Sequence, residues 1–202
     1  DEARAAVEEA LEAPIDKLFV NFGPPVAAAS IAQVHKAQVR LPDGSLRPVA
    51  VKVLRPGIEQ RFRQDLDSYL FAAKLIERFH APSRRLRPIA IVDTLAKSVA
   101  IEMDLRMEAA AISEMEDNIK NDEGFRVPKV DWSRSARRVL TLEWIDGIPI
   151  ADRDGLIAAG FDTKALGAHL MQSFLRHAMR DGFFHADLHP GNLFVDDQGR
   201  IV

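Results

Sequence analysis

The chain has 202 residues, of which 47% are hydrophobic and 28% charged, with 11 glycines and 11 prolines. This composition is typical of a globular protein with one large or two small domains, and it excludes a disordered or collagen-like chain. The formal net charge of −3 gives no overall attraction to a polyanion, so nucleic acid is not expected as a partner. The absence of cysteine excludes disulfides and thiolate chemistry and favours an intracellular location.

The first quarter of the chain predicts a helix followed by a β-hairpin. Residues 1–19 are rich in alanine and glutamate, which predicts a surface helix interrupted at Pro14. Two apolar alternating runs, 31–39 and 49–53, flank a Pro-Asp-Gly turn at 42–44. Such runs on either side of a turn predict two antiparallel strands.

Two helical segments are expected next. The first covers 58–80, ends at a basic, proline-containing break over 82–88, and is amphipathic. Its expected buried stripe consists of Ile58, Phe62, Leu66, Leu70, Ala73 and Ile76. The second covers 91–115 as one helix and carries an acidic cluster at 102–108.

The rest of the chain predicts a strand, a helix and a second hairpin. The strand covers 139–144, and the helix has apolar residues at four-residue intervals from Leu166 and ends at Gly182. The hairpin follows with 192–195 turning through 196–199. Residues 200–202 resemble the start of a strand without a partner, so we expect a fragment of a longer chain.

Strands with inserted helices therefore precede a mainly helical part, which predicts the α+β class with a boundary near Gly147. No apolar run approaches the ~18 residues needed to span a bilayer. The acidic start also lacks the basic and then apolar pattern of a signal peptide. We expect this part of the protein to be soluble.

The densest group of reactive side chains lies in the polar loop 185–192. Asp187 and Asn192 are five positions apart. A carboxylate there can accept the proton of an attacking hydroxyl, and an amide oxygen is a suitable Mg²⁺ ligand, which favours phosphoryl transfer. Two alternatives remain: the polar side chains only satisfy backbone groups of a tight turn, or His185, Asp187 and His189 bind zinc.

Lys52 is the second candidate, because a single lysine in an alternating apolar strand matches the kinase strand that contacts nucleotide phosphates. It needs an acidic partner. On a straight helix Asp104 and Glu108 share a face, whereas Glu102 lies beside Arg106, so Glu108 is the expected partner. The alternative is that these are ordinary solvent-exposed charges.

The run Ala27, Ala28, Ala29 and Ser30 precedes the first strand of the hairpin, where a kinase has glycines that let backbone N–H groups approach phosphates. Alanine carries a Cβ and is less able to adopt positive φ. We therefore expect a stiffer phosphate loop, although small residues also simply permit close packing.

Together these residues resemble the UbiB (ABC1/ADCK) family of atypical protein-kinase-like proteins. The resemblance rests on five blocks in family order. They are AAASIAQVH at 27–35, VAVK at 49–52 with RPG at 55–57, EMD at 102–104 with EAA at 108–110, LEWIDG at 142–147, and HADLHPGN at 185–192. It implies a protein-kinase-like two-lobe fold, truncated in the second lobe, with helical insertions in the first. The first lobe would cover 1–147 and the start of the helical second lobe 148–202.

The resemblance also implies a role for each motif. Residues 27–30 would cover the nucleotide, Lys52 would pair with its phosphates, and Glu108 would hold Lys52. Glu102 and Asp104 would form the family E-x-D motif. The backbone of the hinge, Glu143, Trp144 and Ile145, would meet the adenine. Asp187 would be the catalytic carboxylate and Asn192 a Mg²⁺ ligand.

The implied cofactors are ATP and Mg²⁺, and the implied activity is that of an atypical kinase or ATPase supporting ubiquinone (coenzyme Q) biosynthesis. Quinone precursors, lipids or a coenzyme Q biosynthetic complex would be its partners, at a bacterial or organellar inner membrane. The K-x-G-Q motif would precede residue 1 and the D-F-G metal ligand would follow Val202, so this part alone would be inactive or weak.

Two loop positions depart from ordinary protein kinases. Ala186 stands where an arginine usually receives an activation-loop phosphate, and His189 stands where a lysine helps neutralise the γ-phosphate. The loop is closer to that of small-molecule kinases. A small-molecule phosphotransferase, or a nucleotide-gated lipid-binding or scaffold module, therefore remain alternatives.

Overall fold

The computed structural model describes residues 2–185 and 188–202. These residues form two compact units, each described here by itself. The first comprises Asp1–Ala109 and Asp131–Thr141, and the second comprises Ala110–Val130 and Leu142–Val202. The lobe boundary expected near Gly147 stays a prediction.

A four-stranded sheet organises the first unit, in the order β1 (Pro25–Ala28), β2 (Ala32–Arg40), β3 (Leu46–Leu54) and β4 (Val139–Glu143). The predicted hairpin is confirmed, since β2 and β3 pair antiparallel. The turn forms because Asp43 Oδ1 accepts hydrogen bonds from the Ser45 N–H and hydroxyl, while Gly44 adopts a φ of 85°.

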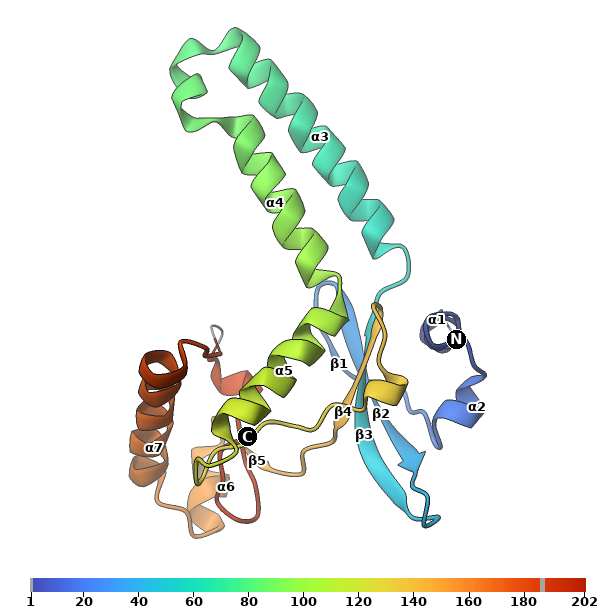
Figure 1. Ribbon diagram of the computed structural model, residues 1–202, viewed down its shortest axis with the longest axis vertical. Helices are drawn as coiled ribbons and strands as arrows, with labels where there is room; N and C mark the ends of the chain where they lie inside the picture. Colours follow the sequence, from blue (N-terminus) through green and yellow to red (C-terminus); the bar gives the residue numbers. More distant parts are fainter. Residues whose placement is uncertain (1, 186–187) are drawn as a thin grey trace. The chain divides into compact units, whose positions relative to one another are not determined.

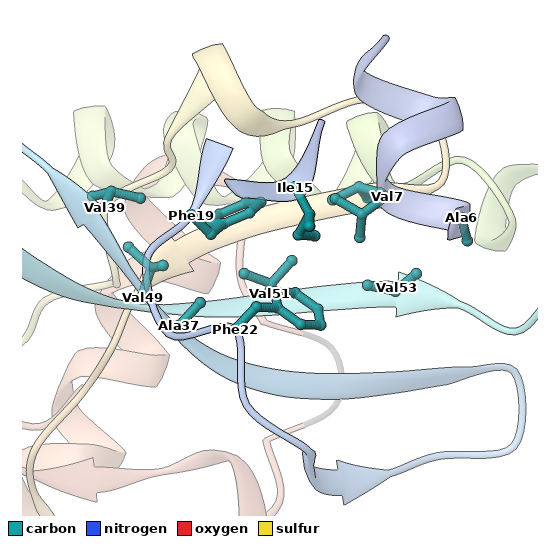
Figure 2. Close-up of a cluster of buried hydrophobic side chains, with 11 residues drawn as sticks. Ala6, Val7, Ile15, Phe19, Phe22, Ala37, Val39, Val49, Val51 and Val53 are labelled. Atoms are coloured by element: carbon teal, nitrogen blue, oxygen red, sulfur yellow. The ribbon is translucent and has the colours of Figure 1, made fainter. Parts of the chain in front are cut away.

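One face of this sheet is covered by the N-terminal segment. The segment forms α1 (Glu2–Leu11) and α2 (Ile15–Leu18), and the expected interruption at Pro14 is confirmed. Figure 2 shows the resulting core, in which Val7, Ile15 and Phe19 lie over the inward side chains of the strands. The strand residues of this core are Ala37, Val39, Val49, Val51, Val53 and Val139.

Between β3 and β4 the chain forms a long helical hairpin. Its parts are α3 (Ile58–Phe79), a short 3₁₀ segment (Ala81–Leu86) and α4 (Pro88–Glu102), and Figure 1 shows the two helices side by side. The expected buried stripe is only partly correct, because Ala73 alone of its members is buried and Ile76 is 42% exposed. A helix in a two-helix hairpin has one neighbour against which to bury a stripe, so most of its apolar surface stays partly open.

The single helix predicted over 91–115 is wrong. The chain breaks after α4 and resumes as α5 (Leu105–Ile119). The break lets both Met103 and Leu105 pack inside, at 5% and 2% exposure. In a continuous helix these two side chains would point about 200° apart, because each residue turns the helix by about 100°.

The second unit is mainly helical. It contains β5 (Ile148–Pro149), α6 (Arg153–Ala158), α7 (Thr163–Arg176), a wider helical turn at His177–Asp181, a 3₁₀ turn (Pro190–Asn192) and β6 (Phe194–Val195). Asp162 caps α7 by accepting hydrogen bonds from the N–H groups of Lys164 and Ala165. The expected stop at Gly182 is confirmed by its φ of 64°.

The last residues do not lack a partner, as the sequence suggested. Ile201 pairs with Val195 across the second hairpin and with Phe125, and it is fully buried. The elements together give the predicted α+β class. Over the described parts of the chain, no helix has both the length and the apolar character needed to cross a membrane.

Candidate active site

Lys52 lies near the C-terminal end of β3, opposite Val34 of β2. Its neighbours Val51 and Val53 are fully buried in the core. Because side chains alternate along a strand, Lys52 points to the other face of the sheet. The same pattern of valines that anchors β3 therefore presents the ammonium away from the core.

The Lys52 ammonium meets the carboxylate of Glu108. Nζ lies 2.7 Å from Oε2, and the two side chains are 30% and 41% exposed. Glu108 is in the first turn of α5, where the helix N-terminus favours a negative charge. An ion pair this exposed adds little stability, about 0–1 kcal/mol. Its effect is to hold the lysine in one place while part of it stays accessible.

Asp104 does not share a helix face with Glu108, contrary to the expectation. It precedes α5, where Oδ1 accepts a hydrogen bond from the Arg106 N–H (3.1 Å), and its carboxylate pairs with the Arg106 guanidinium at 2.6 Å. Hydrogen bonding to Arg106 lowers the pKa of Asp104. Asp104 thus caps α5, and Arg106 pairs with it rather than with Glu102, which ends α4 and is exposed.

The alanine run is only partly a loop. Ala27 and Ala28 belong to β1 and pair with Val34 and Gln33, while Ala29 and Ser30 form the turn to β2. The Ala29 N–H donates to the Ala32 carbonyl, and the Ala29 carbonyl accepts from Arg55 Nε at 3.2 Å. No residue of 27–30, all of which are described, has positive φ, so alanine fits where a more open loop would need glycine.

The expected hinge begins at the end of β4. Glu143 is tied at both its backbone and its side chain, because its N–H donates to the Lys129 carbonyl and its carboxylate accepts from Arg126 and from the Lys129 N–H. Trp144 Nε1 donates to Asp146 Oδ1 at 2.9 Å. Ile145 is half-buried. The start of the segment is therefore held by residues 126 and 129, and Trp144 by a local hydrogen bond.

Arg126 and Asp196 form a network around Glu143 that sequence reasoning missed. Arg126 reaches both carboxylates, at 3.1 Å each. Asp196 is 3% exposed and also accepts hydrogen bonds from the Gln198 and Arg200 N–H groups and the Arg200 guanidinium. Burial raises the pKa of Asp196, but these donors outweigh it and the pKa is lowered. The turn sequence DDQG at 196–199 could have indicated that the Asp196 side chain accepts hydrogen bonds from the backbone of the turn.

The polar loop is described on both sides of residues 186–187. Asp187, the expected catalytic carboxylate, lies outside the described residues, as does Ala186. His189 Nδ1 accepts a hydrogen bond from the Gly191 N–H, and its carbonyl accepts from the Asn192 N–H. Asn192 is exposed, and Leu193 after it is buried. Among the described residues no cluster of three histidines or carboxylates could hold a metal, and the zinc alternative includes Asp187, which is not described.

The structure thus brings together one predicted pair, Lys52 and Glu108, and gives Asp104 a capping role beside it. Comparison with known proteins then decides the family. The family described as the ABC1 atypical kinase-like domain matches residues 1–202. The chain belongs to this family.

Similar proteins support the ABC1 assignment. A "probable protein kinase UbiB" of Marinobacter nauticus is 43% identical over 197 residues, which is 97% of this chain and 35% of that protein. A protein of the same name from Azotobacter vinelandii is 39% identical over 192 residues. A solved structure of Rv3197 in complex with erythromycin, from Mycobacterium tuberculosis, is similar with a TM-score of 0.75 and 30% identity, over 98% of this chain and 49% of that one.

The ABC1 kinase-like fold is therefore confirmed, with the helical hairpin α3–α4 as an insertion after β3. The chain spans 35% of the length of the curated relatives it matches.

Proposed function

We propose that this ABC1 domain binds ATP with Mg²⁺ and serves an atypical kinase or ATPase of the UbiB type. The observation that carries the proposal is the ion pair between Lys52 and Glu108. A strand lysine held by a helix glutamate is the arrangement that kinases use to place the nucleotide phosphates. Family membership alone would not fix an activity, because one fold serves many functions.

The residues present fit a nucleotide and its metal. The Lys52 ammonium is fixed at one carboxylate yet stays 30% exposed, so it can donate a second hydrogen bond to a phosphate oxygen. The short turn at Ala29 and Ser30 would cover the phosphates, and the backbone of residues 143–145 would meet the adenine. Asn192 offers an amide oxygen, which is a suitable Mg²⁺ ligand.

In this proposal Asp187 accepts the proton of the attacking hydroxyl or water, and Lys52 stabilises charge on the phosphates. Bound Mg²⁺ would supply further neutralisation of the phosphate oxygens. Glu108 acts through Lys52 by keeping the ammonium in place. Glu102, at the exposed end of α4, completes the E-x-D motif with Asp104.

Nucleotide binding is tested by calorimetric titration of the chain with Mg-ATP. We expect Lys52→Met to reduce the affinity at least tenfold, because it removes the ammonium that the proposal places at the phosphates. Lys97→Met, at an exposed position of α4, is the matched control and should bind as the parent chain does. Equal affinity of the parent and Lys52→Met would refute the assignment.

The kind of chemistry is tested in the full-length protein. If phosphoryl transfer is the function, Asp187→Asn abolishes ATP turnover but preserves Mg-ATP binding. If the domain is a nucleotide-gated lipid-binding or scaffold module, Asp187→Asn keeps biological complementation and only a Lys52 variant loses it. Labelled phosphate on a quinone precursor would identify a small-molecule phosphotransferase.

The name of the relatives supports a place for the whole protein in ubiquinone biosynthesis. We include in the proposal that the full-length protein works at a membrane, with quinone precursors, lipids or a biosynthetic complex as partners. Loss of ubiquinone in a deletion strain, restored by the parent gene and not by Lys52→Met, is the expected result.

A further inference from the structure

The far end of the α3–α4 hairpin is apolar and exposed. We define the hairpin tip as residues 71–91, which include the end of α3, the 3₁₀ segment and the start of α4. Six large apolar side chains of the tip are between 41% and 73% exposed: Phe71, Leu75, Ile76, Phe79, Leu86 and Ile91. Figure 1 shows this end of the hairpin as the part farthest from the sheet of the first unit.

Apart from Tyr69, the exposed large hydrophobic side chains of α3 lie in the tip. Phe71, Leu75 and Phe79 recur every four residues and therefore form one stripe on the helix. On the same face nearer the sheet the exposed residues are Gln60, Gln64 and Ser68, which are polar. The apolar stripe of α3 thus begins in its distal part, although α4 also exposes Leu95 and Ile101 nearer the sheet.

The tip is also strongly basic, although the whole chain carries a net charge of −3. It contains one acidic residue, Glu77, and five basic ones: Lys74, Arg78, Arg84, Arg85 and Arg87. The Arg78 guanidinium lies over the Phe79 ring at 5.3 Å. Arg84 donates to the carbonyls of Glu77 and Arg78 and so closes the end of α3.

Exposed aromatic and aliphatic side chains among clustered arginines suit the surface of an anionic bilayer. The apolar groups gain by entering the boundary between headgroups and acyl chains, and the arginines gain by meeting negative headgroups. The tip residues come from three consecutive elements, so the whole end is apolar and basic. The net positive charge of the tip favours this occupant over an amphipathic partner helix, which would bind mainly through an apolar groove.

We propose that the hairpin tip docks on the surface of a bilayer that contains anionic lipids. This deepens the membrane part of the proposed function and assigns the contact to residues 71–91. Docking by the tip does not depend on Lys52 or on nucleotide. Failure of the nucleotide-binding proposal would therefore leave the docking proposal intact, and the reverse also holds.

The test uses the absence of cysteine in the chain, which allows one fluorescent label at a chosen position. Phe79→Cys and Gln64→Cys each receive an environment-sensitive dye, and the chain is titrated with vesicles of phosphatidylcholine with phosphatidylglycerol. We expect a blue shift and an increase in intensity at position 79 and no change at position 64. Vesicles of phosphatidylcholine alone should give much weaker binding, and added salt should weaken binding to the anionic vesicles.

Vesicle co-sedimentation of unlabelled variants measures how much the basic and the apolar residues of the tip each contribute to membrane binding. We expect Arg85→Gln to weaken partitioning about fivefold, which corresponds to about 1 kcal/mol for one basic residue near the surface. Phe79→Ala should weaken it about tenfold through lost apolar burial. Gln64→Ala is the matched control and should partition as the parent does. Circular dichroism spectra of all variants should match the parent.

Three results would overturn the proposal. The first is no binding of the chain to anionic vesicles. The second is binding with an equal dye response at positions 64 and 79, which would place the contact elsewhere. The third is that Arg85→Gln and Phe79→Ala partition normally but lose affinity for an acidic segment of protein, which would make the tip a protein-docking site.

Discussion

Lys52 and Glu108 are 56 positions apart in the sequence, yet Lys52 Nζ lies 2.7 Å from Glu108 Oε2. Val51 and Val53, the buried neighbours of Lys52 in the strand, fix the direction of the lysine side chain. A new helix that starts at Leu105 brings Glu108 to the ammonium. The pair is too exposed to add much stability, so its main effect concerns the position of the lysine.

Replacement of Glu108 by glutamine should therefore show whether the ion pair matters for placing the Lys52 ammonium or for the stability of the fold. We expect an unfolding free energy within about 1 kcal/mol of the parent and an affinity for Mg-ATP about fivefold to tenfold lower, because the ammonium is no longer held. Urea denaturation and calorimetric titration measure the two effects. Glu114→Gln, an exposed position on the same helix, should change neither. A large loss of stability with unchanged affinity would contradict this role.

Removal of the cap of α5 should destabilise the chain. Asp104→Ala loses the hydrogen bond to the Arg106 N–H and should cost about 1 kcal/mol, or about 2–4 °C in the melting temperature. Asp104→Asn keeps a capping oxygen and should lose less than Asp104→Ala. If the two variants melt at the same temperature, the side chain stabilises through charge and not through capping.

The buried carboxylate of Asp196 should matter far more than that of its exposed neighbour Asp197. Asp196→Asn leaves Arg126 and Arg200 without their shared acceptor charge, and we expect a loss of about 3 kcal/mol. Asp197→Asn is the matched control and should stay within about 0.5 kcal/mol of the parent. Chemical denaturation of both variants measures the difference, and similar losses would contradict the network.

His177 should make the second unit sensitive to mild acid. It is 2% exposed, and its Nε2 lies 3.3 Å from Asp122 Oδ2 without forming a hydrogen bond. Burial lowers the pKa of His177, although Asp122 and Asp181 act against it. The folded state therefore takes up the proton at lower pH than the unfolded state, whose pKa is about 6.5. Stability should be full above about pH 6.5 and fall as the pH drops below it.

The pKa values of Asp122 and Asp181 are themselves lowered, chiefly by hydrogen bonds from Arg180, so a second loss is expected near pH 4 as these carboxylates become protonated. Urea denaturation at about pH 7, 6 and 5 measures the first loss. His177→Gln removes the titrating group and should flatten that interval. Stability that stays constant or rises towards pH 5 in the parent chain would contradict the prediction.

Much of the fold could be predicted because local signals and packing agree. The Pro-Asp-Gly turn and the alternating valines gave the β2–β3 hairpin, and α3 was expected over 58–80 and found at Ile58–Phe79. The pairing of Lys52 with Glu108 was expected from charge and order along the chain, and the structure forms it.

The predictions were wrong where tertiary packing, and not the local sequence pattern, determines the secondary structure. The break at 103–104 has no glycine or proline to announce it, and it exists because Met103 and Leu105 are both buried. The partners of Ile201 are distant in sequence or across a tight turn, so periodicity could not reveal them. The strand β1 is short, exposed and rich in alanine, which hides it from a search for apolar alternation.

The junction between α4 and α5 has a structural consequence. Met103 and Asp104 join the long hairpin to the helix that holds Lys52 in place, and Glu108 follows Asp104 by about one helical turn, or about 6 Å of rise. The end of the hairpin and the carboxylate that holds Lys52 are therefore separated along the chain by about one helical turn.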